Sequence, residues 1–161
     1  EYARAPKIVL TETNINSIIQ EVSDLYIGGG SNIQIKLLLE PTLPVIDADA
    51  NRLRQLLNNL IKNALEAMEK KRKKQIDLNT RTIQVDGSSA IELVVRDYGD
   101  GFPEHTQGQH FEPYFTPKPK GTGLGLAIVK RIVEEHNGVV SAENTVPKGA
   151  KITIRIPVPR K

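Results

Sequence analysis

The chain has 161 residues, of which 39% are hydrophobic and 25% charged, so it is long enough for one globular domain with its own core. Cys and Trp are absent and aromatic residues make up 4%, which predicts an aliphatic core and excludes disulfides, thiolate metal sites and cysteine nucleophiles. The 22 basic and 19 acidic residues leave a net charge of +3, so a nucleic-acid partner is not expected.

The predicted elements begin after a lead-in, residues 1–13, which we interpret as a linker or the tail of an upstream domain. Asn14 can cap a helix whose apolar residues recur at helical spacing and which ends at Gly28. Alternating apolar residues from Ile33 to Leu39 predict a strand that ends before Pro41.

The longest predicted helix spans about residues 50–71, is capped by Asp47 or Asp49, and ends in the basic run Lys70–Lys74. We interpret that run as a solvated helix end, with a docking surface as the alternative. The remaining predicted elements are a hairpin of strands 76–85 and 90–97 with its turn at 87–89, a loop over 98–122, a helix over 123–136, and strands over 139–144 and 150–157.

This order of elements predicts an α+β fold, a two-layer α/β sandwich with a mixed sheet and helices on one face. Adjacent strands near both ends of the chain argue against a doubly wound parallel sheet. The chain has no internal repeat, and we predict a single domain over residues 14–161.

Polar residues recur every four positions in the longest helix, at Gln55, Asn59 and Asn63, and therefore lie on one face. Asn is a poor helix former, and both asparagines lie at the edge of the apolar stripe, where an amide reaches the rim of a cavity. Amide oxygens there could help hold Mg²⁺ carrying phosphates. An ordinary polar helix surface is the alternative.

A second candidate segment is DYGDG, residues 97–101. Asp97 ends an apolar strand, where its carboxylate can accept a hydrogen bond from an exocyclic amine. Gly99 and Gly101 allow the backbone to approach a flat ligand closely. An ordinary strand-to-loop turn is the alternative.

A third segment, GTGLGL at residues 121–126, opens the next helix. Free amide groups beside Gly121, Gly123 and Gly125 would form a phosphate cradle. The spacing differs from the dinucleotide fingerprint, and the Gly-Lys-Ser/Thr of a P-loop is absent. Before it, in FEPYFTPKPKG at residues 111–121, Lys118 and Lys120 could reach phosphate, or simply lie solvated in a Pro-stiffened loop.

In this order and spacing, four segments resemble the N, G1, F and G2 boxes of sensor histidine kinases. They are QLLNNLIKNALEAM (55–68), DYGDG, FEPYFTPK (111–118) and GTGLGL. The ending, IVEEHNGVVSAEN and KGAKITIRIP, is also similar to the family, so the resemblance covers nearly the whole chain. The F box and lead-in resemble most closely the nitrogen-regulation sensor kinases.

The resemblance implies the Bergerat ATP-binding fold of the GHKL superfamily, shared with gyrase, Hsp90 and MutL, and it implies ATP and Mg²⁺ as cofactors. Asn63 would coordinate the metal, Asn59 would lie near the phosphates, and Asp97 would bind the adenine amine. Residues 102–120 would form the ATP lid. The other implied site residues are Gly99, Gly101 and Phe111 in the pocket, Lys118 and Lys120 as phosphate-neutralising groups, and Gly121, Thr122, Gly123, Leu124 and Gly125 at the phosphates.

The implied reaction is transfer of the γ-phosphoryl group of ATP to a histidine on a dimerisation domain, with a response regulator downstream. In hydrolytic relatives, a water-activating Glu occupies the position that matches Asn59, and an amide cannot act as a carboxylate base. This favours a kinase over the two alternatives, a GHKL-type ATPase and a nucleotide-binding regulatory module without turnover.

The family's phosphoacceptor is a His followed by Glu or Asp on a helix. Thr106 follows His105, Phe111 follows His110, and Asn137 follows His136, so none of the three matches. We therefore expect the chain to bind ATP but not to autophosphorylate without its dimerisation domain. Because it begins at Glu1 rather than Met, we also expect it to be a fragment of a longer protein or a trimmed chain. No apolar run reaches the ~18 residues of a membrane-spanning helix, so we expect no direct membrane contact from this fragment. We expect the fragment to be cytoplasmic, while its parent could still be membrane-anchored.

Overall fold

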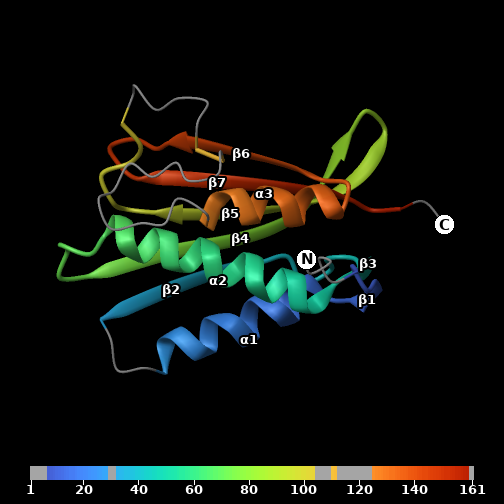
Figure 1. Cartoon of the computed structure of the whole chain (residues 1–161), viewed down its shortest axis with the longest axis horizontal. Helices are drawn as coiled ribbons and strands as arrows, with labels where there is room; N and C mark the ends of the chain where they lie inside the picture. Colours follow the sequence, from blue (N-terminus) through green and yellow to red (C-terminus); the bar gives the residue numbers. More distant parts are fainter. Residues whose placement is uncertain (1–6, 29–31, 104–109, 112–124, 160–161) are drawn as a thin grey trace, which may run out of the picture.

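The computed structural model describes residues 7–28, 32–103, 110–111 and 125–159. Helices and strands in these ranges form two layers, with the helices covering one face of a sheet (Figure 1). In chain order the elements are β1 (Thr11–Thr13), α1 (Ile15–Ile27), β2 (Ile33–Leu39), β3 (Ile46–Ala48), α2 (Ala50–Ala67), β4 (Lys74–Val85), β5 (Ser88–Asp97), α3 (Gly125–Glu135), β6 (Val139–Asn144) and β7 (Ala150–Pro157).

The main sheet has five strands in the order β2-β4-β5-β7-β6. Strand β2 runs parallel to β4, and the other neighbours are antiparallel. The parallel pair arises because α2 lies between β2 and β4 in the chain and carries it back across the same face. The predicted α+β sandwich, with a mixed sheet and helices on one face, is therefore confirmed.

A small second sheet at one end of the molecule was not predicted. Strand β1 pairs antiparallel with β3, and the amide of Val9 donates to Oδ2 of Asp49 at 2.8 Å. The end of the lead-in is therefore held against the start of α2. Strands of three residues are too short for alternation to reveal them, and the domain boundary at residue 14 stays a prediction.

The caps of α1 and α2 follow the sequence. Asn14 accepts a hydrogen bond from the amide of Ser17, and Asp49, one of the two predicted caps, accepts from the amide of Arg52 at 3.1 Å. The predicted end of α2 at residue 71 is wrong, because the helix ends at Ala67. The chain then turns, with the amide of Lys71 donating to the carbonyl of Met68, and the basic run lies beyond the helix.

The hairpin and the end of α3 also differ slightly from prediction. The β4–β5 turn is Asp86-Gly87 rather than 87–89, since both residues have positive φ angles of 50° and 78°. Helix α3 ends one residue before the predicted 136, at Glu135. Three backbone bonds close its end: the amides of His136 and Gly138 donate to the carbonyl of Val133, and the amide of Asn137 donates to that of Glu134.

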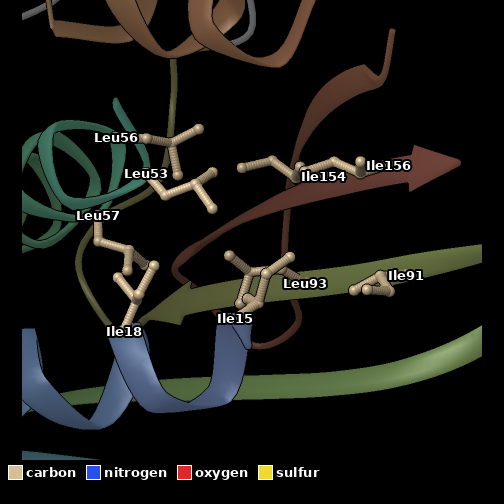
Figure 2. Close-up of a pocket in the computed structure, with 9 residues that line it drawn as sticks. All are labelled: Ile15, Ile18, Leu53, Leu56, Leu57, Ile91, Leu93, Ile154 and Ile156. Carbon is tan, nitrogen blue, oxygen red and sulfur yellow. The ribbon is translucent and has the colours of Figure 1, made fainter. Parts of the chain in front are cut away.

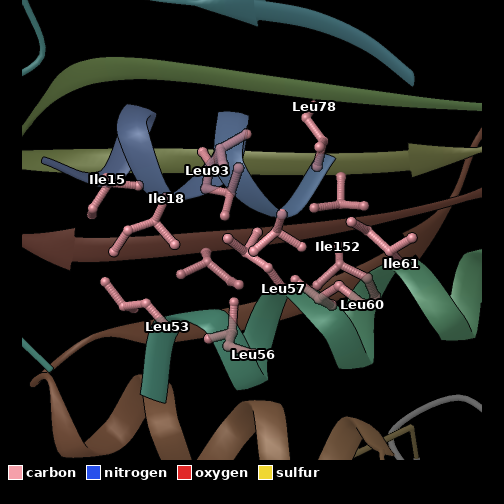
Figure 3. Packing of buried hydrophobic residues seen from close by; sticks show 14 of the residues in the cluster. Ile15, Ile18, Leu53, Leu56, Leu57, Leu60, Ile61, Leu78, Leu93 and Ile152 are labelled. Atoms are coloured by element: carbon pink, nitrogen blue, oxygen red, sulfur yellow. The ribbon is translucent and has the colours of Figure 1, made fainter. Parts of the chain in front are cut away.

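The core between the two layers is aliphatic, as predicted from the composition. Figure 3 shows Leu57, Leu60 and Ile61 of α2 pointing towards the sheet. A cavity of about 20 Å³ remains beside the first half of α2 (Figure 2). Its walls are the apolar side chains of Ile15, Ile18, Leu53, Leu56, Leu57, Ile91, Leu93, Ile154 and Ile156.

The opposite face of the sheet is open and polar. Glu92 of β5 is only 5% exposed there and lies between two arginines, with Nε of Arg81 at 2.7 Å and Nε of Arg155 at 3.1 Å. Within the ranges given above, no helix combines the length and the apolar character needed to cross a membrane.

Candidate functional site

The end of β5 lies between the end of α2 and the start of β7. Asp97 is the last residue of β5 and is 5% exposed. Its Oδ1 accepts hydrogen bonds from the amides of Gly99 at 2.9 Å and Ala150 at 3.3 Å. Two backbone donors on one oxygen fix the orientation of this carboxylate, and burial makes it a strong acceptor for a ligand donor.

The two glycines after Asp97 are required by close packing. A Cβ on Gly99 would lie 2.5 Å from the carbonyl oxygen of Ala67, at the end of α2. Gly101 has a φ of 81°, and a Cβ there would lie 2.8 Å from Oδ1 of Asn144. The close approach predicted for these glycines thus occurs towards the protein itself, and their contact with a flat ligand stays a prediction.

Asn59 and Asn63 are both half-buried on α2, in the position at the edge of the apolar stripe that their spacing predicted. Gln55, the third member of the series, is exposed. Nδ2 of Asn59 is buried and has no hydrogen-bond partner among the described residues. Leaving such a donor unpaired costs about 1–3 kcal/mol, so an acceptor placed beside this amide would be favourable. Oγ of Ser23 and Nε of Arg96 are likewise buried without a partner among the described residues.

Helix α3 begins at Gly125 with space beside it, since a Cβ on that residue would meet no atom within 4 Å. Its inner face is fixed by Val129, Ile132 and Val133, which are buried against the core. The α3 start is therefore both anchored and open. Six predicted site residues lie outside the described residues: Lys118, Lys120, Gly121, Thr122, Gly123 and Leu124.

Sequence reasoning missed the contacts that fix the loop after Asp97. The side chain of Asn144 accepts from the amide of Phe102 at 2.7 Å and donates to its carbonyl at 2.8 Å. The ring of Phe102 stacks on His110, with centroids 3.9 Å apart, while Phe111 next to it is half-buried. No local pattern marks Asn144, because it lies 42 residues from its partner.

Tyr98, between Asp97 and Gly99, is anchored on the open face of the sheet. Its hydroxyl donates to Oδ2 of Asp77, and the guanidinium of Arg96 lies 4.6 Å from its ring centroid. The hydrogen bond to Asp77 is the main cause that raises the pKa of Tyr98. The phenol of Tyr98 therefore stays protonated, and its bond to Asp77 fixes the position of Tyr98, which directly follows the buried Asp97.

Two lysines border the same region. Nζ of Lys148 lies 3.6 Å from Oδ1 of Asp100, and the nearby Lys148 ammonium lowers the pKa of Lys71. Lys71 of the basic run and Lys148 of the turn between β6 and β7 thus both lie beside the loop that follows Asp97.

Taken together, the arrangement is suited to binding and orienting a ligand. Asp97 can accept from a neutral donor group, whereas the N-terminal end of a helix such as α3 favours an anion. Asn59 supplies an unused donor, and Asn63 carries an amide oxygen of the kind that a hard cation prefers.

Comparison with known proteins identifies the family of the chain. A family model described as "Histidine kinase-, DNA gyrase B-, and HSP90-like ATPase" matches residues 48–160. The sensor protein TdiS of Thauera aromatica is 34% identical over 92% of this chain and 27% of its own length. The sensor histidine kinase ZraS of Salmonella typhi is 34% identical over 98% of this chain and 33% of its own. The chain therefore spans about a third or less of these curated relatives.

Solved structures with the same fold include the catalytic domain of histidine kinase ThkA in a nucleotide-free form. It has a TM-score of 0.80 and 31% identity, over 93% of this chain and 98% of that domain. ThkA in complex with the response regulator protein TrrA has a TM-score of 0.77 and 28% identity, over 94% of this chain and 42% of that chain.

Proposed function

This chain belongs to the family of histidine kinase-, DNA gyrase B- and HSP90-like ATPases, and we propose that it is the ATP-binding catalytic domain of a sensor histidine kinase. Membership of the family implies nucleotide binding. The observation that best supports Asn59 and Asn63 as the phosphate side of the site is the buried, unpaired Nδ2 of Asn59. A phosphate oxygen would satisfy this donor.

The residues present fit Mg-ATP. The adenine amine is a donor that suits the oriented carboxylate of Asp97. The phosphates suit the open start of α3 at Gly125, and Asn63 offers an oxygen to Mg²⁺. Bound Mg²⁺ would neutralise phosphate charge, which is the main electrostatic demand of phosphoryl transfer.

In the proposed reaction, a histidine nitrogen forms a bond to the γ-phosphorus while the bond to the bridging oxygen breaks and ADP leaves. The chain's own contribution is to orient the nucleotide, because such transfer depends on positioning and charge. Asn59 cannot deprotonate water, so its amide favours transfer to an imidazole over hydrolysis. Lys118 and Lys120 stay predicted phosphate-neutralising groups.

We propose that the phosphoacceptor lies in another part of the parent protein, because neither described histidine is suited to the role. His136 is 6% exposed, its Nε2 accepts from the amide of Asp49 at 3.0 Å, and its Nδ1–H donates to the carbonyl of Ile132 at 2.8 Å. Both nitrogens are thus occupied by structural bonds. His110 stacks on Phe102, and His105 lies outside the described residues.

We further propose that the histidine lies on a dimerisation domain of the same parent, and that a response regulator acts downstream in a two-component phosphorelay. The similarity to ThkA, which has been solved with the response regulator TrrA, supports this partner class. A cytoplasmic location and the nitrogen-regulation type belong to the same proposal.

The decisive experiment mixes the chain with the cognate dimerisation domain and ATP labelled at the γ-phosphate. We expect acid-labile label on the dimerisation domain and none on the chain alone. Steady phosphate release without the dimerisation domain would instead favour an ATPase, and nucleotide binding without either product would favour a regulatory module. An Asn63→Ala variant should lose the transferred label, while the exposed Gln55→Ala variant on the same helix should retain it.

A further inference from the structure

A side-chain amide at the end of β6 acts as a clamp on the backbone of the loop that follows Asp97. Oδ1 of Asn144 accepts from the amide of Phe102 at 2.7 Å, and Nδ2 donates to the carbonyl of the same residue at 2.8 Å. Asn144 is the last residue of β6 and pairs with Ala150 of β7. Its carboxamide therefore extends the hydrogen bonding of the sheet edge to a segment that is not itself a strand.

The clamp has room only because residue 101 is a glycine. With φ at 81°, Gly101 turns its backbone towards Asn144, and a Cβ would lie 2.8 Å from Oδ1 of that amide and 2.9 Å from the carbonyl of Gly149. The contact between Asn144 and the loop thus requires glycine at residue 101 for two reasons, the positive φ and the lack of space for a Cβ.

The same loop is held on its other side by α2. Gly99 lies against Ala67, and its amide bonds to the carboxylate of Asp97. Residues 97–101 comprise the last residue of β5 and the four that follow it. They are fixed between one contact with α2 and one with β6. If either contact is removed, the loop can shift, and the hydrogen bonds that orient Asp97 are then disturbed.

We propose that Asn144 is a positioning residue for nucleotide binding, which presets the loop of residues 97–102 before the base arrives. The inference rests on the proposed function. The role requires an acceptor and a donor on one short side chain, which Asn supplies and Asp, with acceptors only, does not. The clamp also places the ring of Phe102 against His110.

The test measures Mg-ADP binding to the chain by calorimetry, together with amide hydrogen exchange of Phe102. For Asn144→Ala, which removes two hydrogen bonds, we expect affinity to fall by about 5- to 30-fold and exchange at Phe102 to accelerate. Asn144→Asp keeps one bond and places a charge beside the Phe102 carbonyl, so it should also bind more weakly. Glu143→Ala, which removes only the 2.9 Å ion pair with Lys151, is the matched control and should bind as the unaltered chain does.

In the phosphotransfer assay, Asn144→Ala should raise KM for ATP and leave kcat nearly unchanged, a division that general loss of folded protein would not produce. Unaltered affinity in Asn144→Ala, with exchange at Phe102 accelerated, would overturn the positioning role while leaving the proposed function intact. If the unaltered chain failed to bind Mg-ADP, the proposed function would fall, and this inference with it.

Discussion

Close packing leaves no space for a side chain at Gly99, which lies directly beside the proposed base-binding carboxylate. In Gly99→Ala, the added Cβ would lie 2.5 Å from the carbonyl oxygen and 2.9 Å from the Cβ of Ala67, both on a rigid helix. An ordinary carbon–oxygen contact is about 3.3–3.6 Å, so the loop must withdraw by about 1 Å. The hydrogen bond from the residue 99 amide to Asp97, now 2.9 Å, would then lengthen or break.

The expected cost of this overpacking is about 1–3 kcal/mol of unfolding free energy. For a domain of this size, that corresponds to a fall in Tm of about 2–12 °C. Disturbing the hydrogen bond that the base would donate to the charged carboxylate of Asp97 should weaken Mg-ADP binding by about 10- to 150-fold. Thermal denaturation and calorimetry measure the two effects separately.

Gly28→Ala is the matched control for Gly99→Ala. Gly28 has a φ of −70°, and its Cβ would first meet an atom at 3.4 Å, so both Tm and nucleotide affinity should stay close to those of the unaltered chain. If Gly99→Ala also left both quantities unchanged, the loop would be able to shift freely, and the argument that close packing orients Asp97 would be wrong.

Three further variants separate folding from function. Asp97→Asn keeps an oxygen for the two backbone donors, so Tm should change little while Mg-ADP affinity falls about 10- to 150-fold in calorimetry; equal affinity would exclude the base-binding role. His136→Phe leaves the amide of Asp49 without its partner, so urea unfolding should show a loss of about 1–3 kcal/mol, yet label transfer per folded molecule should persist. Burial alone would raise the pKa of Glu92, but the bonds and charges of its two arginines hold that pKa below its usual value. Its ionised form therefore stabilises the fold near neutral pH, and this contribution is lost as pH falls below the ordinary Glu pKa, so urea unfolding of Glu92→Gln should depend less on pH in that acid range than the unaltered chain.

Elements with strong local signals could be predicted from the sequence almost to the residue. Strand β2 was recognised by its alternating apolar residues, and Asn14 marked the start of α1. The end of α2 was placed four residues too late, because Lys and Arg in the basic run are good helix formers and no glycine or proline marks the stop. Propensity alone could not show that the chain must turn there to enter β4.

The residues of the candidate site also fall into two groups, those that a local sequence pattern marks and those that it does not. Asn59, Asn63 and Asp97 could be proposed from the sequence because each lies at a definite place on a helix or strand. The structure leaves the two asparagines half-buried, as their spacing predicts, whereas the burial of Asp97 was not predicted. Tyr98 and Asn144 were missed, since their partners are 21 and 42 residues away in the chain. Contacts of that kind depend on the order of strands in the sheet, which spacing within one segment does not reveal.

The missed contacts explain how a glycine-containing loop can hold a buried carboxylate in one orientation. Glycine adds conformational freedom, so residues 97–101 would by themselves be among the least ordered parts of the pocket. The structure removes that freedom from three directions, through Ala67 on α2, Asp77 on β4 and Asn144 on β6. Each anchor belongs to a different element, so the loop can be ordered only after the helix layer and both halves of the sheet have come together. The geometry presented to the base is for this reason a property of the whole sandwich, and substitutions at the anchors should act on nucleotide affinity without touching the nucleotide.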